Sequence, residues 1–203
     1  MYYKEEKLAM LIIDMQNAFL HEKGHLVVGG EDNTKYLEIV PNVIDLAQTA
    51  REHNIPVIYM RHAYLDGYVD GGILVHELFP EDKLVNGWID GTFDTEVYEP
   101  LKPQTGDLVL RKNRYSSFFG TGLDTILRNL GVNSLIITGI HANCCCESTA
   151  RDAVWHDYRV YFMSDGTATA DDDLKKATLR NIAMNFGTVM TTKDMEEKIV
   201  ENQ

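Results

Sequence analysis

An acid, a base and a thiol each follow a short apolar run in this sequence. Asp14 follows AMLII, Lys112 follows DLVLR, and three consecutive cysteines, with Cys145 in the middle, come shortly after SLIITG. A thiol attacks a carbonyl carbon only as the thiolate, which is scarce at neutral pH because free cysteine has a pKa of about 8.5. Lys112 and the N-terminus of a helix beginning near Cys145 would stabilise that thiolate. Asp14 would take the thiol proton and pass it to a leaving amine, which hydrolyses an amide through a thioester without metal or cofactor.

Each of these residues also has an ordinary structural interpretation. Asp14 suits a helix cap or a turn, and Lys112, beside Arg111 and Arg114, suits a solvated charged face. A single cysteine is most often a small buried hydrophobic residue. Residues 144–146 are adjacent, whereas zinc sites draw on separated pairs, and without further cysteines no conventional intrachain disulfide forms. The joint occurrence of acid, base and thiol at equivalent strand ends favours a catalytic site.

Alternating strand and helix patterns are expected to position these groups. Short continuous apolar runs are typical of strands buried on both faces of a sheet, and they cover 8–14, 55–61, 107–112, 134–139, 159–165 and 187–192. Helical spacing covers 35–53, 121–131, 145–157 and 171–186. This order predicts one α/β domain over residues 1–203, a three-layer α-β-α, doubly wound, Rossmann-like fold with a mostly parallel six-stranded sheet. Ligands bind beyond the carboxyl ends of such strands, where the three groups would meet.

Residues 63–105 interrupt the alternation. This segment is rich in glycine, proline, aromatic and acidic residues, so we expect a long excursion with little regular structure. Long loops in compact domains are often functional lids, while exposed aromatic residues such as Trp88, Phe93 and Tyr98 would suit a subunit interface. The excursion is therefore expected to be a lid or an interface, and the sequence leaves both open.

Composition narrows the classes of partner. The formal net charge of -12 repels nucleic acids and anionic membrane surfaces. The N-terminal MYYKEEKLAMLIIDMQ is not typical of a signal peptide, and no apolar run approaches the roughly 18 residues that cross a bilayer. We expect a soluble cytoplasmic protein with reduced thiols that acts on a small molecule, with no nucleic acid or membrane partner.

Three ordered motifs carry a family resemblance. The segments LIIDMQNAFL, GDLVLRKNRYSSFFGTGLDTILRNLGV and LIITGIHANCCCESTARDAV together resemble the isochorismatase-like cysteine hydrolases, which include nicotinamidases, N-carbamoylsarcosine amidohydrolases and ureidoacrylate amidohydrolases. The resemblance runs from about residue 8 to residue 190 and is weakest between 62 and 100. It implies a catalytic triad of Asp14, Lys112 and Cys145, with the cysteines on either side as bystanders.

The resemblance also implies details of the pocket. A cis peptide would join Ile140 to His141, and the N–H groups of His141 and Cys145 would form the oxyanion hole. Phe19 matches an aromatic position that commonly lines the family's pocket, and Tyr115 and Trp88 are further substrate-binding candidates. His141 stands where the family often has a small residue, so its ring either narrows the pocket and contacts substrate or turns away to pack.

The motifs separate this chain from some family members. Nicotinamidases hold a metal with an Asp-x-His pattern after the second strand; here the sequence is YMRHAYLDGYVDGG, and His62 and Asp66 do not reproduce that pattern. We therefore expect neither a bound metal nor nicotinamide as substrate, and no cofactor. The lysine and cysteine motifs look most like those of ureidoacrylate and carbamoyl amide hydrolases, whose substrates are small polar ureido or carbamoyl compounds. Family members are commonly oligomeric, which implies a homo-oligomer, a dimer or a tetramer.

Two other functions remain open. True isochorismatases cleave a vinyl ether with the aspartate and lysine, and carry Gly and then Cys where this chain has Cys145 and Cys146; the stretch ARDAVWHDYRVYFMSD also looks like those enzymes. A cysteine at position 145 instead favours amide hydrolysis. The third alternative is a noncatalytic binding protein on the same scaffold, but such proteins usually lose a triad member and this chain keeps all three.

Overall fold

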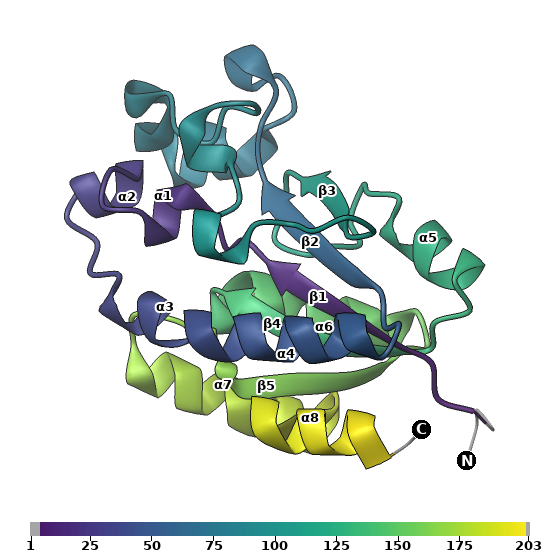
Figure 1. Cartoon of the computed structure of the whole chain (residues 1–203). Coiled ribbons are helices and arrows are strands. Elements are labelled where there is room, and N and C mark those ends of the chain that lie inside the picture. Colours follow the sequence, from purple (N-terminus) through teal and green to yellow (C-terminus); the bar gives the residue numbers. More distant parts are fainter. Residues whose placement is uncertain (1–4, 202–203) are drawn as a thin grey trace.

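A six-stranded, wholly parallel sheet forms the centre of the molecule (Figure 1). The computed structural model describes residues 5–201. The strand order is β3-β2-β1-β4-β5-β6. The strands are β1 (Leu8–Ile13), β2 (Val57–His62), β3 (Leu108–Lys112), β4 (Ser134–Ile140), β5 (Arg159–Ala168) and β6 (Thr188–Met190). This arrangement confirms the predicted single-domain, doubly wound α/β fold.

Helices cover both faces of the sheet. On one face lie α4 (Val40–Glu52) and α8 (Thr192–Glu201), and on the other lie α5 (Leu123–Asn129), α6 (Glu147–Trp155) and α7 (Asp172–Asn185). Successive residues of a strand point to opposite faces, so Met10 and Ile12 join one buried cluster while Leu11 and Ile13 join the other. The sequence patterns predicted α4 to α7 in outline but missed α8.

Strand burial depends on position in the sheet. The central strands β1 and β4 are buried on both faces as predicted. The prediction is wrong for β3 and β6, since Leu108 and Val109 are exposed and the residues of β6 are at most half-buried. Both are edge strands, with a neighbour on only one side, so the helical layers cover them incompletely.

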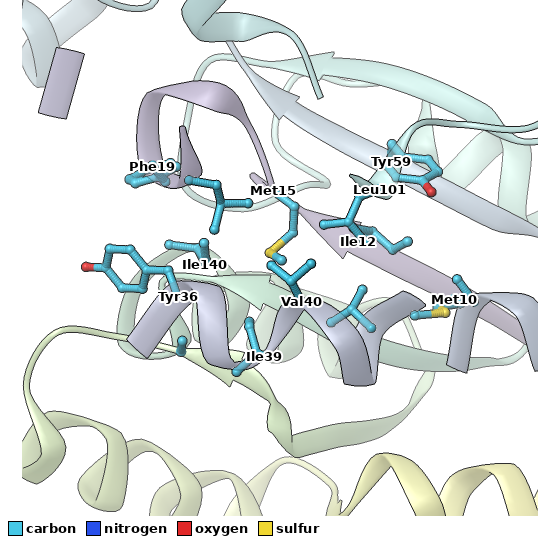
Figure 2. Close-up of a cluster of buried hydrophobic side chains, with 14 of the residues drawn as sticks. Met10, Ile12, Met15, Phe19, Tyr36, Ile39, Val40, Tyr59, Leu101 and Ile140 are labelled. Carbon is cyan, nitrogen blue, oxygen red and sulfur yellow. The ribbon is translucent and has the colours of Figure 1, made fainter. Parts of the chain in front are cut away.

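Between β1 and α4 the chain forms three short helices, of which the sequence patterns missed the first two and predicted the third as the start of the helix at 35–53. They are α1 (Asn17–Leu20), α2 (His25–Val28) and α3 (Thr34–Glu38). Figure 1 shows α1 and α2 beside the excursion, beyond the arrowheads of β1 and β2. Figure 2 shows Phe19, Tyr36 and Ile140 together at one end of the apolar cluster under α4. The apolar core therefore continues to the carboxyl end of the sheet.

The excursion at 63–105 contains only short 3-10 and π turns, as predicted. They are η1 (Asp66–Tyr68), η2 (Leu74–Leu78), η3 (Pro80–Val85), η4 (Phe93–Thr95) and η5 (Glu99–Leu101). The side chain of Gln16 fastens the excursion by donating to the carbonyl groups of His62 at 3.0 Å and Thr95 at 3.1 Å. Trp88 is only 5% exposed, so its predicted place among exposed interface aromatics is wrong, because its ring packs inward against Phe19.

No helix within residues 5–201 has the length and apolar character needed to traverse a lipid bilayer.

Candidate active site

Asp14 lies directly beyond the end of β1, in an unusual backbone conformation. Its φ of 53° falls in the left-handed region, which residues other than glycine rarely adopt and which is often found at functional sites. The adjacent strand approaches closely there: a Cβ on Gly139, whose φ is +119°, would lie 2.0 Å from the carbonyl oxygen of Ile13. The packing of β1 against β4 thus fixes the position of Asp14.

Lys112 ends β3 and joins the other two predicted catalytic residues. Its Nζ donates to Asp14 Oδ2 at 2.7 Å, to the carbonyl of Arg114 at 3.2 Å and to Cys145 Sγ at 3.5 Å. The lysine is 1% exposed, so it does not belong to a solvated charged face. Acid, base and thiol therefore meet at the carboxyl end of the sheet.

Cys145 lies in a π turn, Ala142–Cys146, that continues into α6. Single π turns inside helical segments occur frequently at functional sites. Thr149, one turn further along, accepts the N–H of Ser117 at 3.0 Å and donates to the carbonyl of Cys145 at 2.7 Å. The segment that follows Lys112 in sequence therefore anchors the turn that carries the thiol.

The charges around Cys145 oppose one another. The hydrogen bond with the Cys144 thiol, burial and the Asp14 carboxylate raise the pKa of Cys145 well above its ordinary value, whereas Lys112 lowers it. The same hydrogen bond lowers the pKa of Cys144. Lys112 acts in the predicted direction but is outweighed, so the resting Cys145 sulfur is a thiol. Its proton must leave as the sulfur attacks.

Lys112 and Asp14 are arranged for that transfer. Burial alone lowers the pKa of Lys112, but the contacts with Asp14 and Cys145 outweigh it and raise the pKa, so the lysine stays charged. Asp14 uses Oδ2 in the ion pair, while its Oδ1 is buried and has no hydrogen-bond partner in the described part of the chain. A buried carboxylate oxygen without a partner is a good acceptor for a proton.

The turn before Cys145 has the geometry that the resemblance implied. The peptide bond between Ile140 and His141 is cis. The carbonyl of His141 accepts the N–H groups of Cys144 and Cys146, each at 3.1 Å. Its own N–H meets no acceptor among residues 5–201. This N–H is thus available to an oxyanion, and the predicted oxyanion hole of His141 and Cys145 stays a prediction.

A cavity of about 220 Å³ lies over Asp14 and Cys145. All three predicted substrate-binding residues, Phe19, Tyr115 and Trp88, line it. The sequence interpretation missed further lining residues: Leu26, Glu31, His62, Tyr64, Leu74, Phe79, Asp82 and Cys144. Five of them come from the excursion and the end of β2, so the excursion forms a wall of the cavity.

The flanking cysteines differ from each other. Cys146 is fully buried, and its Sγ lies 3.8 Å from the carbonyl of Thr138, so it is a bystander in the core as predicted. Cys144 lines the cavity and hydrogen bonds the Cys145 thiol, so it is more than a bystander. The π turn sets the direction of the Cys144 side chain, and the sequence did not indicate that direction.

His141 combines the two alternatives that the sequence left open. Its ring lines the cavity and lies edge-on to Phe19, with ring centroids 4.9 Å apart. Its Nε2 lies 2.9 Å from Tyr36 Oη and 3.4 Å from Glu31 Oε1, and Tyr36 donates to that carboxylate at 2.6 Å. The ring therefore both narrows the cavity and takes part in a hydrogen-bond network behind it.

His62 also lines the cavity, and the sequence did not indicate it as a pocket residue. Its Nδ1 is buried without a hydrogen-bond partner within residues 5–201. Burial, followed by the charges of Lys112 and Arg114, lowers the pKa of His62 well below its ordinary value, so the ring is neutral. Gln16 holds the backbone of His62 by accepting its N–H at 2.7 Å. The sequence did hold an indication that His62 lies near the site, because Gln16, which bonds its backbone, lies in the same motif as Asp14.

Two larger cavities lack this chemistry. One of about 420 Å³ lies at the opposite end of the sheet between Lys7, Asn54 and Leu130, and one of about 600 Å³ lies beside Phe93 and Pro103. Neither is lined by a cysteine or by the Asp14–Lys112 pair. In the part of the chain from 5 to 201, no cluster of three or more His, Cys, Asp or Glu side chains is placed to hold a metal ion.

Comparisons with known proteins agree with this geometry. A family model described as the isochorismatase domain matches residues 8–194. The chain is 36% identical to the ureidoacrylate amidohydrolase RutB of Caulobacter vibrioides, over 93% of this chain and 89% of that protein.

Solved structures give the same result. A cysteine hydrolase from Pseudomonas syringae pv. phaseolicola is similar with a TM-score of 0.88 and 33% identity, covering 97% of this chain and 94% of that one. N-carbamoylsarcosine amidase from Thermoplasma acidophilum has a TM-score of 0.74 and 29% identity, over 92% and 96%. The fold, the match over most of the sequence and these relatives together show that the chain belongs to the isochorismatase family.

Proposed function

We propose that this protein is a cysteine hydrolase that cleaves a C–N bond of a small amide, ureido or carbamoyl compound through a thioester on Cys145. The observation that carries the proposal is the single ammonium nitrogen of Lys112 that contacts both Asp14 Oδ2, at 2.7 Å, and Cys145 Sγ, at 3.5 Å, at the base of a cavity. The names of the relatives, a ureidoacrylate amidohydrolase and an N-carbamoylsarcosine amidase, support the same reaction class.

The first step forms a bond between sulfur and carbon. Because Cys145 rests as a thiol, its proton moves to Asp14 Oδ1 as Sγ attacks the substrate carbonyl carbon. Lys112 stays charged and stabilises the sulfur as it loses its proton. The carbonyl oxygen becomes an oxyanion, which the N–H groups of His141 and Cys145 stabilise in this proposal.

The second step breaks the C–N bond. Asp14 returns the proton to the leaving nitrogen, which departs as ammonia or an amine and leaves a thioester on Cys145. Water then attacks the thioester carbon and gives a proton to Asp14. As the C–S bond breaks, Asp14 passes this proton to the departing sulfur, which restores the Cys145 thiol and releases the acid product. One water is consumed in each turnover, and Asp14 ends each cycle as it began.

The experiment is a screen of small amides, ureas and carbamoyl compounds for ammonia release, run with the native protein beside Cys145→Ala. Ammonia release by the native protein and its loss in the variant are expected. Turnover that survives in Cys145→Ala would eliminate the thioester and favour the vinyl ether chemistry of true isochorismatases, which uses only the aspartate and the lysine. Silence of both proteins across the panel would favour a noncatalytic binding function.

We also propose that the protein works as a homo-oligomer in the cytoplasm. The excursion exposes apolar side chains, including Val69, Leu78 and Leu84, which suit a subunit interface. All three cysteines are free, which suits a reducing compartment. Light scattering coupled to size exclusion tests the first statement, and a dimer or tetramer mass is expected. A monomer mass at micromolar concentration would contradict it.

A further inference from the structure

The cavity over Cys145 has an acidic wall. Glu31, just beyond α2, and Asp82, in the excursion, both line it, and their side chains are 29% and 17% exposed. Among the described residues, 5–201, no lysine or arginine lines it. Lys112 beneath the cavity is already bonded to Asp14. A substrate entering this cavity therefore meets two carboxylates and no fixed positive charge that is free to pair with it.

The arginines that flank Lys112 are engaged elsewhere. Arg111 forms an ion pair with Asp70, and Arg114 donates to the carbonyl oxygen of Asp70 at 3.0 Å. Both guanidinium groups thus bond the excursion rather than line the cavity. They do not offer the paired N–H donors with which arginine recognises a carboxylate.

The histidines near the cavity do not supply the missing charge. His62 is neutral, because burial holds its pKa far below the ordinary range. His25 has Nδ1 3.1 Å from Asp94 and Nε2 4.0 Å from Asp82, so one imidazolium would face two carboxylates. His141 Nε2 faces Tyr36 and Glu31. None of these rings presents an unopposed positive charge to the cavity.

The two acids have room for a further partner. Glu31 receives the Tyr36 hydroxyl on Oε1, which also lies 3.4 Å from His141 Nε2. Within residues 5–201, Asp82 is paired through the longer contact to His25 and a hydrogen bond with Trp88. Burial is the largest influence on the pKa of Asp82 and raises it, which marks a carboxylate whose charge is incompletely compensated. Such a group gains most when a cation binds beside it.

Two buried polar atoms in the same cavity lack partners within residues 5–201: Asp14 Oδ1 and His62 Nδ1. Buried polar atoms usually have a hydrogen-bond partner, so an orphaned pair in one cavity indicates a ligand. The Asp14 atom serves the reacting end of the substrate. The neutral His62 ring can bond the amide or ureido group without attracting an anion.

We propose that this active site selects small amide or ureido compounds that carry an amine at the end remote from the scissile bond, and rejects those that carry a carboxylate there. The inference rests on the proposed hydrolysis at Cys145 and names its substrate class. Glu31 and Asp82 are the specificity-determining residues. Such a site would disfavour ureidoacrylate as a substrate, because the acrylate end of that compound is a carboxylate.

Three ureas with the same chain length beyond the urea nitrogen test the proposal: N-(2-aminoethyl)urea, N-propylurea and 3-ureidopropionate, whose ends are cationic, neutral and anionic. For the native protein, kcat/KM is expected to be about 100-fold higher for the cationic urea than for the anionic one, since like charges at close range repel strongly. The neutral urea is expected in between. A ratio of one or below overturns the proposal.

Charge-removing variants locate the cause. In Glu31→Gln and in Asp82→Asn the cationic-to-anionic ratio is expected to fall by about tenfold each. The ratio cancels any general damage from losing the Tyr36 or Trp88 contact, because all three ureas meet the same protein. Glu38→Gln is the matched control: Glu38 is exposed on α3 and does not line the cavity, so the ratio should stay unchanged. A ratio that moves equally in the control would contradict selection at the wall.

The failure of this inference is distinguishable from that of the proposed function. If N-propylurea is hydrolysed and depends on Cys145, while 3-ureidopropionate is preferred over the amine, the chemistry stands and the substrate class is wrong. If none of the three ureas is hydrolysed, binding affinity tests the inference instead. Cys145→Ala is then titrated calorimetrically with N-(2-aminoethyl)urea and with 3-ureidopropionate. Tighter binding of the amine supports the inference, and equal or weaker binding overturns it.

Discussion

The floor of the cavity and its outer wall are built in different ways. The floor consists of Asp14, Lys112 and Cys145, each held at a strand end or in the turn after it by the parallel sheet. The wall comes mostly from the short helices after β1 and from the excursion, where regular hydrogen-bond ladders are missing, and the ring of His141, from the turn after β4, completes it. A rigid sheet suits groups that exchange a proton, whereas loops can vary in sequence without disturbing the sheet. We therefore propose that the chemistry belongs to the floor and the selectivity to the wall.

Replacing a floor residue is expected to have the largest effect. Lys112→Met leaves Asp14 as a buried carboxylate without its cation, so kcat/KM should fall by about 10³-fold or more for every substrate. The free energy of unfolding should fall by about 3 to 5 kcal/mol. Steady-state kinetics and urea unfolding measure the two effects.

The conservative variant Lys112→Arg keeps the charge but not the single-nitrogen geometry. Compared with Lys112→Met, it should therefore recover part of the free energy of unfolding but not kcat/KM. Activity of Lys112→Met close to that of the native protein would show that the floor is not the chemical centre.

The close approach of β4 to β1 can be broken at Gly139. In Gly139→Ala the new Cβ would sit 2.0 Å from the Ile13 carbonyl oxygen at a φ of +119°, so we expect a loss of about 3 kcal/mol or more in unfolding free energy. Gly120→Ala is the matched control, because Gly120 also has positive φ but open space around it; about 1 kcal/mol is expected there. Equal losses in the two variants would mean that crowding beside Asp14 has no role.

A wall residue should change selectivity and spare the chemistry. His141→Ala removes a ring that narrows the cavity but leaves Tyr36 bonded to Glu31. We expect kcat for the best substrate to stay within about tenfold of the native value, while relative kcat/KM values across a panel of branched and linear amides shift by about tenfold. An equal and large loss of kcat/KM for every substrate would mean that His141 acts with the floor residues in the chemistry and not in selectivity.

The smallest effect concerns the order in which thiols react. The raised pKa of Cys145 and the lowered pKa of Cys144 predict that iodoacetamide modifies Cys144 first near neutral pH, and Cys145 only as the pH rises above the ordinary thiol range. Because folding favours the protonated Cys145, its contribution to stability is complete below the unfolded pKa and is lost as pH rises through the folded one. Peptide mass spectrometry after timed alkylation measures the order, and selective modification of Cys145 at pH 6 would contradict it.

The difference between the floor and the wall of the cavity also explains which features the sequence could predict. Continuous apolar runs in 8–14 and 134–139 placed Asp14 and the cysteines at one edge, because parallel strands must end together. The excursion and the segment between α2 and α3 have no periodicity from which side-chain directions follow, so the positions of Asp82 and Glu31 on the cavity wall were missed. Only the resemblance suggested Trp88 as a pocket residue, and its aromatic character equally suggested an exposed interface. The edge strand β3 was predicted as buried because composition does not reveal a strand's place in the sheet.

The most direct test of the central claim is to trap the covalent intermediate. The native protein is mixed with a hydrolysed amide, quenched in acid within one turnover and digested for mass spectrometry. The account predicts that the peptide containing Cys145 gains the mass of the acyl or carbamoyl group, and that this adduct disappears in Cys145→Ala together with ammonia release. Full turnover with Cys145 never modified, or with alanine in its place, would contradict it.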